Sequence, residues 1–410
     1  MVELVLHYRK VSRHALNVLW GAVEVAPATA GLRCAAAEGP DALTRTVNAA
    51  LAVGRRPVVA WSFYSASFPE VAAELALVRG RTGPGALHLA GGPHASAAPD
   101  EVLRAGFDLV AVGEGEETLP ALLSRLDAGA TIGDVPGIAW LDGGRLRRSP
   151  RAPPVRLDDH PPCAPGARRI GPLEITRGCV WACRFCQTPF LFRARFRHRS
   201  LAEVRRWVRF HRAIAARDLR FLSPSALSYG AEGPGCDLDA VEALLAAARE
   251  EAGPERRIFF GSFPSELRPE HVSPRALALI RRFCDNRTVI VGAQSGSERM
   301  LAAMGRGHGV TDVERAVALC VEAGFETSVD VMVGLPGEEE DDRAATRGLL
   351  ERVGARGARV HAHAFMPLPG APWATERPGA LDAATRALLA RMESGGAAHG
   401  QWRRQRARSA

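Results

Sequence analysis

Apolar residues recur along the first third of the chain in two alternating patterns. Short runs in which most residues are apolar predict buried strands, and segments with apolar residues every three or four positions predict amphipathic helices. The predicted strands cover residues 2–7, 58–63, 86–89 and 109–112. The predicted helices cover residues 14–25, 69–79, 97–105 and 116–126. Alternation at this pitch predicts a parallel sheet with helices on both faces.

The same alternation resumes in the second half of the chain. Predicted strands cover residues 173–176, 219–222, 258–260, 289–293, 327–333 and 360–365. Predicted helices cover residues 201–213, 238–248, 275–283, 313–322 and 343–353. Six strands, each followed by a helix, predict a (β/α)6 partial barrel, a fold that carries its chemistry at the carboxyl ends of the strands.

The expected fold class is therefore α/β, with a Rossmann-like (flavodoxin-like) first domain and a partial TIM barrel. The first domain is predicted to cover residues 1–141 and the barrel residues 173–375. Between them, residues 142–172 are rich in proline, glycine and arginine and lack apolar periodicity, which indicates an extended linker. Residues 376–410 are predicted to form a helix and a basic tail.

Composition narrows the class of protein. The chain has 410 residues, 47% of them hydrophobic, and no apolar run approaches the roughly 18 residues of a membrane span. The start of the chain, Met1-Val2-Glu3-Leu4, carries an early acid and does not have the pattern of a signal peptide. We therefore expect a cytoplasmic protein. Five of the eight cysteines are scattered and form no disulfide framework.

The net charge of +8 is a weak guide to partners. Lys10 is the one lysine among 53 basic residues, and alanine, glycine and proline are abundant. This bias is typical of a GC-rich genome, so nucleic acid is an unlikely partner and a membrane is not expected.

Three cysteines stand close together at the middle of the chain. Cys179, Cys183 and Cys186 follow a predicted strand and the turn Arg177-Gly178, with three and two residues between them. Structural zinc takes four ligands, and no second cysteine or histidine pair lies nearby. A cubane iron–sulfur cluster held by three cysteines has one iron without a protein ligand. Three buried or zinc-binding cysteines are the alternative.

This spacing, with the aromatic Phe185 before the third cysteine, resembles the signature of the radical S-adenosylmethionine (radical SAM) enzymes. The resemblance implies that the three cysteines hold a [4Fe–4S] cluster whose open iron chelates the methionine moiety of S-adenosylmethionine. Reductive cleavage would release methionine and a 5′-deoxyadenosyl radical. It also implies a flavodoxin or ferredoxin-type electron donor.

Later strand ends resemble the same family. Ser223 lies at the strand end where the family binds the methionine amino group, although the Gly-Gly-Glu motif of the family is absent there. Gln294 and Ser295 resemble the fourth-strand contacts to ribose and carboxylate, and Gly334 and Pro336 the turn against which adenine packs. With Phe185, these are the residues that the resemblance implies for S-adenosylmethionine binding.

Two glycine-rich loops follow strands of the first domain. They are Gly91-Gly92-Pro93-His94 and Gly113-Glu114-Gly115-Glu116. Ahead of a three-cysteine loop, this order resembles the cobalamin (B12)-binding domain of many radical SAM enzymes. The resemblance implies contacts to cobalamin from Ser62, Ser65, Gly91, Gly92, Gly113 and Gly115.

One feature of many cobalamin domains is missing. Their Asp-x-His-x-x-Gly motif, whose histidine holds the cobalt, is replaced here by Ser12-Arg13-His14-Ala15-Leu16-Asn17. His14 is therefore interpreted as a surface or capping residue rather than a cobalt ligand. His94 is either a plain loop histidine or a residue that approaches the corrin.

The roles of several other side chains have more than one interpretation. Arg193, Arg195, Arg197 and Arg199 form either a solvated basic segment or a site that compensates a reduced cluster or docks an acidic electron donor. His361 and His363 are expected on one face of a strand. They are either core residues, or groups for acid–base chemistry or contact with the corrin. Arg306-Gly307-His308, in a glycine-rich loop, is a further candidate for contact with substrate or cofactor.

The leading hypothesis is a cobalamin-dependent radical SAM enzyme that modifies an unactivated carbon of a small-molecule or peptide substrate, most simply by methyl transfer. A radical SAM enzyme that does not use cobalamin, acting by rearrangement, cyclisation or tRNA methylthiolation, is one alternative. Methylthiotransferases resemble the barrel, but bring three further cluster cysteines and an RNA module, and neither feature is found here. A cobalamin-binding sensor or carrier with an inactive barrel is the other alternative.

Overall fold

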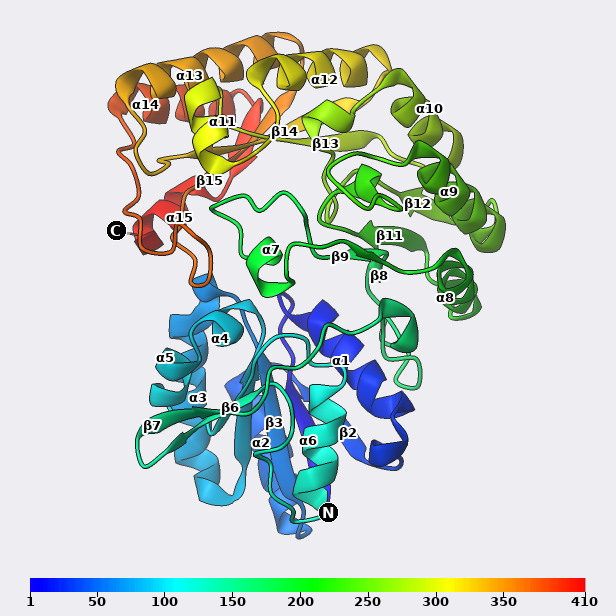
Figure 1. Ribbon diagram of the computed structural model, residues 1–410, viewed down its shortest axis with the longest axis vertical. Coiled ribbons are helices and arrows are strands. Elements are labelled where there is room, and N and C mark those ends of the chain that lie inside the picture. Colours follow the sequence, from blue (N-terminus) through cyan, green and yellow to red (C-terminus); the bar gives the residue numbers. More distant parts are fainter. Residues whose placement is uncertain (410) are drawn as a thin grey trace. The chain divides into compact units, whose positions relative to one another are not determined.

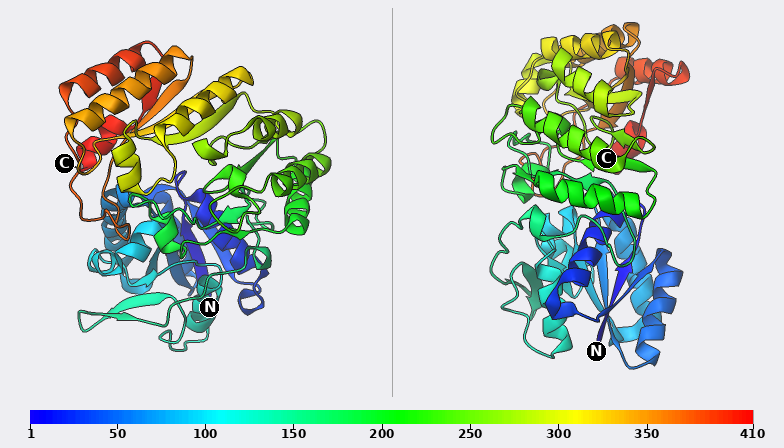
Figure 2. Two further views of the ribbon diagram at one scale, coloured as in Figure 1. Left: turned by 45° about the horizontal axis from the view of Figure 1, so that its top comes forward. Right: turned by 90° about the vertical axis from the view of Figure 1, so that its right-hand side faces the viewer.

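The structure is a computed structural model that describes residues 1–409. Contacts within the chain divide it into an N-terminal unit, Met1–Gly171, and a C-terminal unit that begins at Pro172. The N-terminal unit is built on one sheet and the C-terminal unit on several, and each unit has its own hydrophobic cores (Figures 1 and 2). Among the described residues, no helix combines the length and the apolar character needed to cross a membrane.

The N-terminal unit is built on one seven-stranded sheet. The strand order is β2-β1-β3-β4-β5-β6-β7, in which β1 to β5 are parallel and the last two strands are antiparallel. The strands are β1 Val2–His7, β2 Arg33–Ala37, β3 Arg56–Ser62, β4 Leu87–Gly91, β5 Leu109–Ala111, β6 Ile138–Asp142 and β7 Arg145–Arg148. The order of the first five strands is that of flavodoxin-like folds, as predicted.

Helices cover both faces of this sheet because alternate strand residues point to opposite sides. Val5 and Val59 contact one helical layer, whereas Leu4 and Val58 contact the other. The helices are α1 Arg13–Val25, α2 Gly39–Ala52, α3 Phe68–Thr82, α4 Pro93–Ala97, α5 Pro99–Arg104 and α6 Thr118–Asp127. Residues of α2, α3 and α5 line one core, and residues of α1 and α6 line the other.

Residues 142–172 differ from the predicted linker. Gly143 and Gly144 both have positive φ and turn the chain into β7, which pairs with β6 as a hairpin. Further on, the Glu24 carboxylate accepts hydrogen bonds from the backbone of Gly166 and Ala167, each at 2.8 Å. The segment is thus packed on the N-terminal unit, because side chains of that unit satisfy backbone groups that no helix or strand pairs.

The C-terminal unit contains the predicted partial barrel. Strands β8, β11 and β12 form one parallel sheet, and β13, β14, β15 and β16 form another. Leu267 bridges the two sheets, because its backbone pairs with Ile290 and Gly292 on β13. The strands are β8 Leu173–Glu174, β9 Thr176–Arg177, β10 Arg197–His198, β11 Asp218–Leu222, β12 Arg257–Phe259, β13 Thr288–Gln294, β14 Glu326–Val333, β15 Arg359–Ala364 and β16 Ala398–Gly400.

Six helices form an outer arc over these strands (Figure 1), namely α8 Leu201–Ala213, α9 Leu238–Ala252, α10 Pro274–Phe283, α12 Val310–Glu322, α13 Glu340–Ala355 and α14 Ala383–Ser394. The shorter helices α7 Thr188–Leu191, α11 Glu298–Met304 and α15 Trp402–Ser409 lie outside this arc. The α/β fold class is confirmed. The tail differs from its prediction, because residues 376–409 hold a seventh parallel strand, β16, between two helices.

Candidate functional site

The three-cysteine loop leaves the end of β9 and is largely buried. Cys183 is 4% exposed, while Cys179 and Cys186 are partly exposed, and none forms a disulfide. Burial raises the pKa of Cys179 to about 11 and also raises that of Cys186. Thiolates at these positions therefore need a strongly positive partner, which the iron atoms of a cluster provide.

The loop does not have the geometry of a single-ion site. Thiolates around one zinc ion, at bonds of about 2.3 Å, are separated by about 3.8 Å. Within residues 1–409, the one set of three potential ligands whose donor atoms all lie within 4.8 Å of one another is found elsewhere, on β14 and β15. The wider spread of the three sulfurs fits a polynuclear cluster.

Backbone and side-chain contacts anchor the loop to two distant segments. The Arg184 N–H donates to the Met304 carbonyl at 2.9 Å, and the Gln187 side chain donates to the Pro369 carbonyl at 2.7 Å. Phe185 packs against an apolar group at the barrel rim. Its members are Met300, Leu301, Met304, Leu335, Phe365 and Trp373. Phe185 therefore positions the loop, in addition to its predicted closeness to cofactor.

A buried arginine contacts one of the cysteines. Nη1 of Arg306 lies 3.7 Å from Sγ of Cys183, and its Nη2 donates to the Gly292 carbonyl at 2.6 Å. Burial alone would lower the pKa of Arg306, but the facing charges of Cys183 and Glu266 raise it. Arg306 thus stays cationic beside a cluster ligand.

A second arginine holds the loop through an aromatic ring. The Arg268 guanidinium lies 3.6 Å from the ring centroid of Trp181, which is in the loop, and also donates to the Arg306 carbonyl. Glu270 accepts from Arg268 at 2.5 Å and lies 3.4 Å from His308. A Cβ on Gly307 would lie 2.4 Å from the Trp181 ring, so this position requires glycine. The sequence pointed to Arg306, Gly307 and His308 as candidates for contact with substrate or cofactor. It did not indicate that these residues hold the cysteine loop.

The other predicted S-adenosylmethionine contacts lie at strand ends of the barrel. Gln294, at the end of β13, is 6% exposed and has a φ of 75°, which is rare for a residue other than glycine. Such strain is concentrated at functional sites. The hydroxyl of Ser223 bonds to the Ser225 carbonyl at 2.7 Å, and Ser295 bonds to Thr346 and Ser297. Both serine hydroxyls are therefore already used within the barrel.

The turn after β14 carries Gly334 and Pro336. Gly334 has a φ of 68°, and the Leu335 N–H donates to the Glu338 carboxylate at 2.9 Å. Burial raises the pKa of Glu338 to about 7. The turn is therefore closed by a carboxyl group that is readily protonated.

Glu266 is an acid to which no sequence pattern described above pointed. A Cβ on Gly292 would lie 2.7 Å from its carboxyl oxygen, so the glycine makes room for the carboxyl. Burial raises the pKa of Glu266, and the charge of Arg306 opposes that rise.

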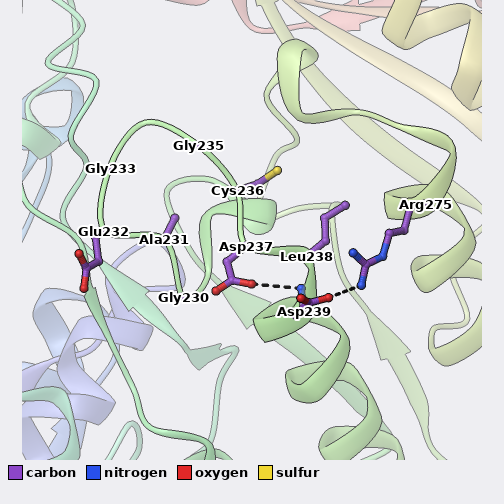
Figure 3. Close-up of a pocket in the computed structure, with 10 residues that line it drawn as sticks. All are labelled: Gly230, Ala231, Glu232, Gly233, Gly235, Cys236, Asp237, Leu238, Asp239 and Arg275. Carbon is purple, nitrogen blue, oxygen red and sulfur yellow. Dashed lines mark hydrogen bonds and ion pairs between the residues drawn. The ribbon is translucent and has the colours of Figure 1, made fainter.

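An open hollow of about 730 Å³ lies beside the loop that leads into α9 (Figure 3). Asp237 caps α9 by accepting from the Asp239 N–H at 3.1 Å, and Asp239 pairs with Arg275. The hollow contains none of the predicted site residues.

In the N-terminal unit, the predicted cobalamin contacts follow three adjacent strands. Ser62 ends β3 and Ser65 follows it, Gly91 ends β4 and Gly92 follows it, and Gly113 and Gly115 follow β5. A Cβ on Gly113 would meet no atom within 4 Å, and one on Gly91 none nearer than 3.8 Å. Gly92 has a φ of 90° and lies against Phe63. The backbone of Gly113 therefore faces open space and that of Gly91 has room for a Cβ without a clash, which fits a bulky ligand at this edge.

His94 is packed inside the N-terminal unit and has no free approach to that edge as a cobalt ligand. His94 is 4% exposed, with its Nδ1 3.1 Å from the Ser65 hydroxyl and its ring 4.4 Å from that of Phe68. It is an internal residue of α4. His14 lies in the first turn of α1, whose N-cap is Ser12.

Comparisons with known proteins agree with this division. Residues 173–350 match the family model of the Radical SAM superfamily, and residues 28–123 match that of the B12 binding domain. A tRNA-2-methylthio-N(6)-dimethylallyladenosine synthase of Chlorobium phaeovibrioides is 34% identical over 183 residues, 44% of this chain and 39% of the relative. That of Halorhodospira halophila is 28% identical over 74% of this chain and 61% of the relative. The chain thus matches less than two thirds of each of these relatives.

Solved structures resemble the chain over a greater length. The radical S-adenosylmethionine methyltransferase TsrM from Kitasatospora setae, solved with cobalamin and a [4Fe–4S] cluster, has a TM-score of 0.71 at 20% identity. The alignment covers 91% of this chain and 73% of TsrM. The cobalamin-dependent S-adenosylmethionine radical enzyme OxsB has a TM-score of 0.68 at 14% identity, covering 85% of this chain and 52% of OxsB. At these identities the likeness is one of fold.

The matched domains imply three cofactors, a [4Fe–4S] cluster, S-adenosylmethionine and cobalamin. The buried thiols and the open glycine backbones described above fit the first and the last of these. The chain therefore combines an N-terminal B12-binding domain with a C-terminal domain of the Radical SAM superfamily.

Proposed function

We propose that this chain is a cobalamin-dependent radical SAM enzyme that transfers a methyl group to an unactivated carbon of a small-molecule or peptide substrate. The observation that carries the proposal is the buried loop of Cys179, Cys183 and Cys186 with the Arg306 cation against one sulfur. When bound, the cluster supplies an electron for cleavage of S-adenosylmethionine, and cobalamin supplies a methyl carrier.

The residues of the barrel then bind and orient. Three thiolates hold the cluster and leave one iron free for S-adenosylmethionine. Gln294 offers an amide at the end of β13, and the turn at Gly334 and Pro336 offers backbone groups for adenine. Ser223 and Ser295 support the strand ends, since their hydroxyls bond within the barrel.

The N-terminal unit is proposed to bind cobalamin at the edge formed by the ends of β3, β4 and β5. The backbones of Gly91 and Gly113 approach the ligand, because a Cβ at Gly113 would meet no atom within 4 Å and one at Gly91 none nearer than 3.8 Å. His94 is held by Ser65 and Phe68, so cobalamin is proposed to bind without a histidine on the cobalt.

A first experiment tests the whole proposal. The full chain is reconstituted anaerobically with iron, sulfide and hydroxocobalamin, desalted, reduced, and incubated with S-adenosylmethionine carrying a deuterated methyl group. We expect broad iron–sulfur absorption, corrin bands, and formation of 5′-deoxyadenosine or S-adenosylhomocysteine by mass spectrometry. Iron–sulfur absorption without corrin would contradict the cobalamin role, and absence of both chromophores would contradict the whole proposal.

Methylthiolation of tRNA is the second candidate, favoured by the 34% identity over 183 residues to tRNA methylthiotransferases. That reaction requires a second cysteine set in the N-terminal unit, where this chain has only Cys34 and Cys163. Incubation of the reconstituted chain with unmodified tRNA, followed by nucleoside mass spectrometry, tests it. A methylthio adenosine product would favour this candidate over methyl transfer to carbon.

A further inference from the structure

Two strands of the barrel turn three potential metal ligands toward the same point. Val329, Val331 and Val333 of β14 pack on the outer helices, so Asp330 of β14 points to the opposite, inner face. On β15, Val360 and Ala362 face the helices in the same way, and His361 and His363 face inward. Because β14 and β15 are paired in register, Asp330 lies beside His361.

The distances within this group match those between ligands of one metal ion. Nδ1 of His361 lies 3.1 Å from Oδ1 of Asp330 and 3.2 Å from Nε2 of His363, and all three atoms lie within 4.8 Å of one another. Ligands bound at about 2.0–2.1 Å in tetrahedral or octahedral geometry are separated by about 3.0–3.4 Å. His361 is thus already at a coordinating separation from each of its two partners, and the ligand atoms of the other two side chains lie within 4.8 Å of each other.

Hydrogen bonds account for both contacts only if a single hydrogen is shared between them. A neutral imidazole has one N–H and one lone pair, so Nδ1 of His361 carries either a hydrogen or a lone pair. With a hydrogen, it must divide that hydrogen between Asp330 and Nε2 of His363. With a lone pair it can accept from His363 but then faces the carboxylate oxygen without a hydrogen between them. A cation at the centre satisfies all three atoms.

Neighbouring side chains hold the imidazoles in orientation. The Gln405 amide on α15 lies 3.3 Å from Nδ1 of His363, and its oxygen accepts from the Ala364 N–H at 2.8 Å. His399 of β16 stacks on His361 with ring centroids 4.6 Å apart. Ligation through Nε2 leaves the ring hydrogen of His363 on Nδ1, and the Gln405 oxygen, which has a second lone pair beside the one used by the Ala364 N–H, can accept it after a small shift of the amide. Outer partners of this kind are a regular feature of metal-bound histidines.

The electrostatic surroundings also favour a cation. Glu266 lies close enough to Asp330 for the two carboxyl charges to repel. His361 and Asp330 remain partly accessible, with side chains 29% and 16% exposed, so an ion can reach them. The nearby cations Arg268 and Arg306 are engaged by Glu270 and by the cysteine loop.

We propose that Asp330, His361 and His363 form a mononuclear site for a divalent first-row transition ion of the zinc type, distinct from the three-cysteine loop. Two imidazoles and one carboxylate leave at least one position open, as in catalytic zinc sites and in mononuclear iron sites. That position would bind a polar substrate group such as a hydroxyl or a carboxylate. The site belongs to the C-terminal unit alone and does not depend on the proposed methyl transfer.

Zinc binding to the reconstituted holoprotein tests the site. With the cysteines occupied by the cluster, we expect isothermal titration with zinc to give one ion per chain, and mass spectrometry after desalting to find it retained. Asp330→Asn and His363→Ala should each weaken binding by about 100-fold, and Gln405→Leu by 10- to 100-fold as an outer partner. His399→Phe keeps the stacked ring and should bind as the wild type does.

A second measurement excludes binding to thiols. A full-length variant with Cys179, Cys183 and Cys186 changed to alanine is titrated with cobalt(II), which reports its ligands by its visible spectrum. Weak visible bands without thiolate charge transfer, lost in the added Asp330→Asn variant, support the site. Equal zinc affinity in wild type and Asp330→Asn would overturn it, as would a thiolate-type cobalt spectrum. If His363→Ala fails to fold, the nearly isosteric Asp330→Asn decides.

Discussion

Arg306 and Cys183 are 123 positions apart in the chain, and the guanidinium Nη1 of the first lies 3.7 Å from the sulfur of the second. The arginine is fully enclosed and makes its other strong bond to the Gly292 carbonyl on β13. One side chain therefore connects the cysteine loop to the barrel wall, and brings a positive charge to a sulfur that carries negative charge as a thiolate. A hydrogen bond to a ligand sulfur is one of the means by which proteins tune iron–sulfur clusters.

The first prediction concerns the reduction potential of the cluster. Arg306→Gln removes the positive charge at Cys183, so the reduced cluster loses stabilisation and its midpoint potential becomes more negative. A hydrogen bond to a charged group contributes about 1.5–3 kcal/mol, and for a one-electron couple about 1.4 kcal/mol corresponds to roughly 59 mV, so a change of up to about 100 mV is expected. Redox titration followed by electron paramagnetic resonance measures it. Arg282→Gln, at an exposed arginine on α10, is the control, and equal potentials in all three proteins would contradict the prediction.

The second prediction concerns cluster retention. Serine at Cys179, Cys183 or Cys186 removes one of three ligands, so we expect most iron to be lost on desalting and the cleavage of S-adenosylmethionine to fall at least 100-fold. Iron and sulfide assays with detection of 5′-deoxyadenosine measure both. Cys320→Ser, at a buried cysteine of α12, should keep full iron. Full iron in any of the three loop variants would contradict the assignment of that cysteine as a ligand.

The third prediction concerns the strand end at Gly91. A Cβ there meets no atom nearer than 3.8 Å, so Gly91→Val should leave thermal unfolding of the chain within a few degrees of the wild type. The valine side chain would occupy space that we propose for cobalamin, so affinity for hydroxocobalamin should fall at least tenfold. Corrin absorbance after desalting measures it. Gly80→Ala, in open space on α3, is the matched control. Unchanged corrin retention in Gly91→Val would place the ligand elsewhere.

The sequence predicted much of the fold because its signals are local. Valine-rich runs such as residues 58–63 and 327–333 are buried strands in the structure, and the three cysteines could be recognised from their spacing. Strand β2 was missed because Arg33-Cys34-Ala35-Ala36-Ala37 has few residues that favour strands. Strand β16 was missed because three residues, Ala398-His399-Gly400, carry no periodicity.

Contacts between distant residues could not be predicted in this way. The approach of Arg306 to Cys183 and of Gln405 to His363 depends on how the barrel closes, which no single-sequence pattern records. His361 and His363 were placed on one face by their spacing, but their partner Asp330 is on another strand. For Ser223 and Ser295, residue type and position suggested contact with S-adenosylmethionine. Their hydroxyls bond to other residues of the barrel, which the sequence did not indicate.

The fourth prediction concerns pH and the turn that we propose for adenine. Burial raises the pKa of Glu338 from its ordinary value of 4.5 to about 7. Between these two values the unfolded chain releases the proton and the folded chain keeps it, so the stability contributed by this group is complete below pH 4.5 and is lost as pH rises through 7.

Glu338→Gln remains neutral at every pH and therefore escapes this loss. Its thermal stability relative to the wild type should rise between pH 5 and pH 8, by on the order of 2 kcal/mol, because each unit of pKa shift corresponds to about 1.4 kcal/mol. The glutamine oxygen can still accept from the Leu335 N–H, so the turn at Gly334 stays closed. Melting curves at both pH values, with the exposed Glu351→Gln on α13 as control, measure the difference. If Glu338→Gln and the wild type differ by the same amount at pH 5 and pH 8, the carboxyl is ionised in the folded chain throughout this range.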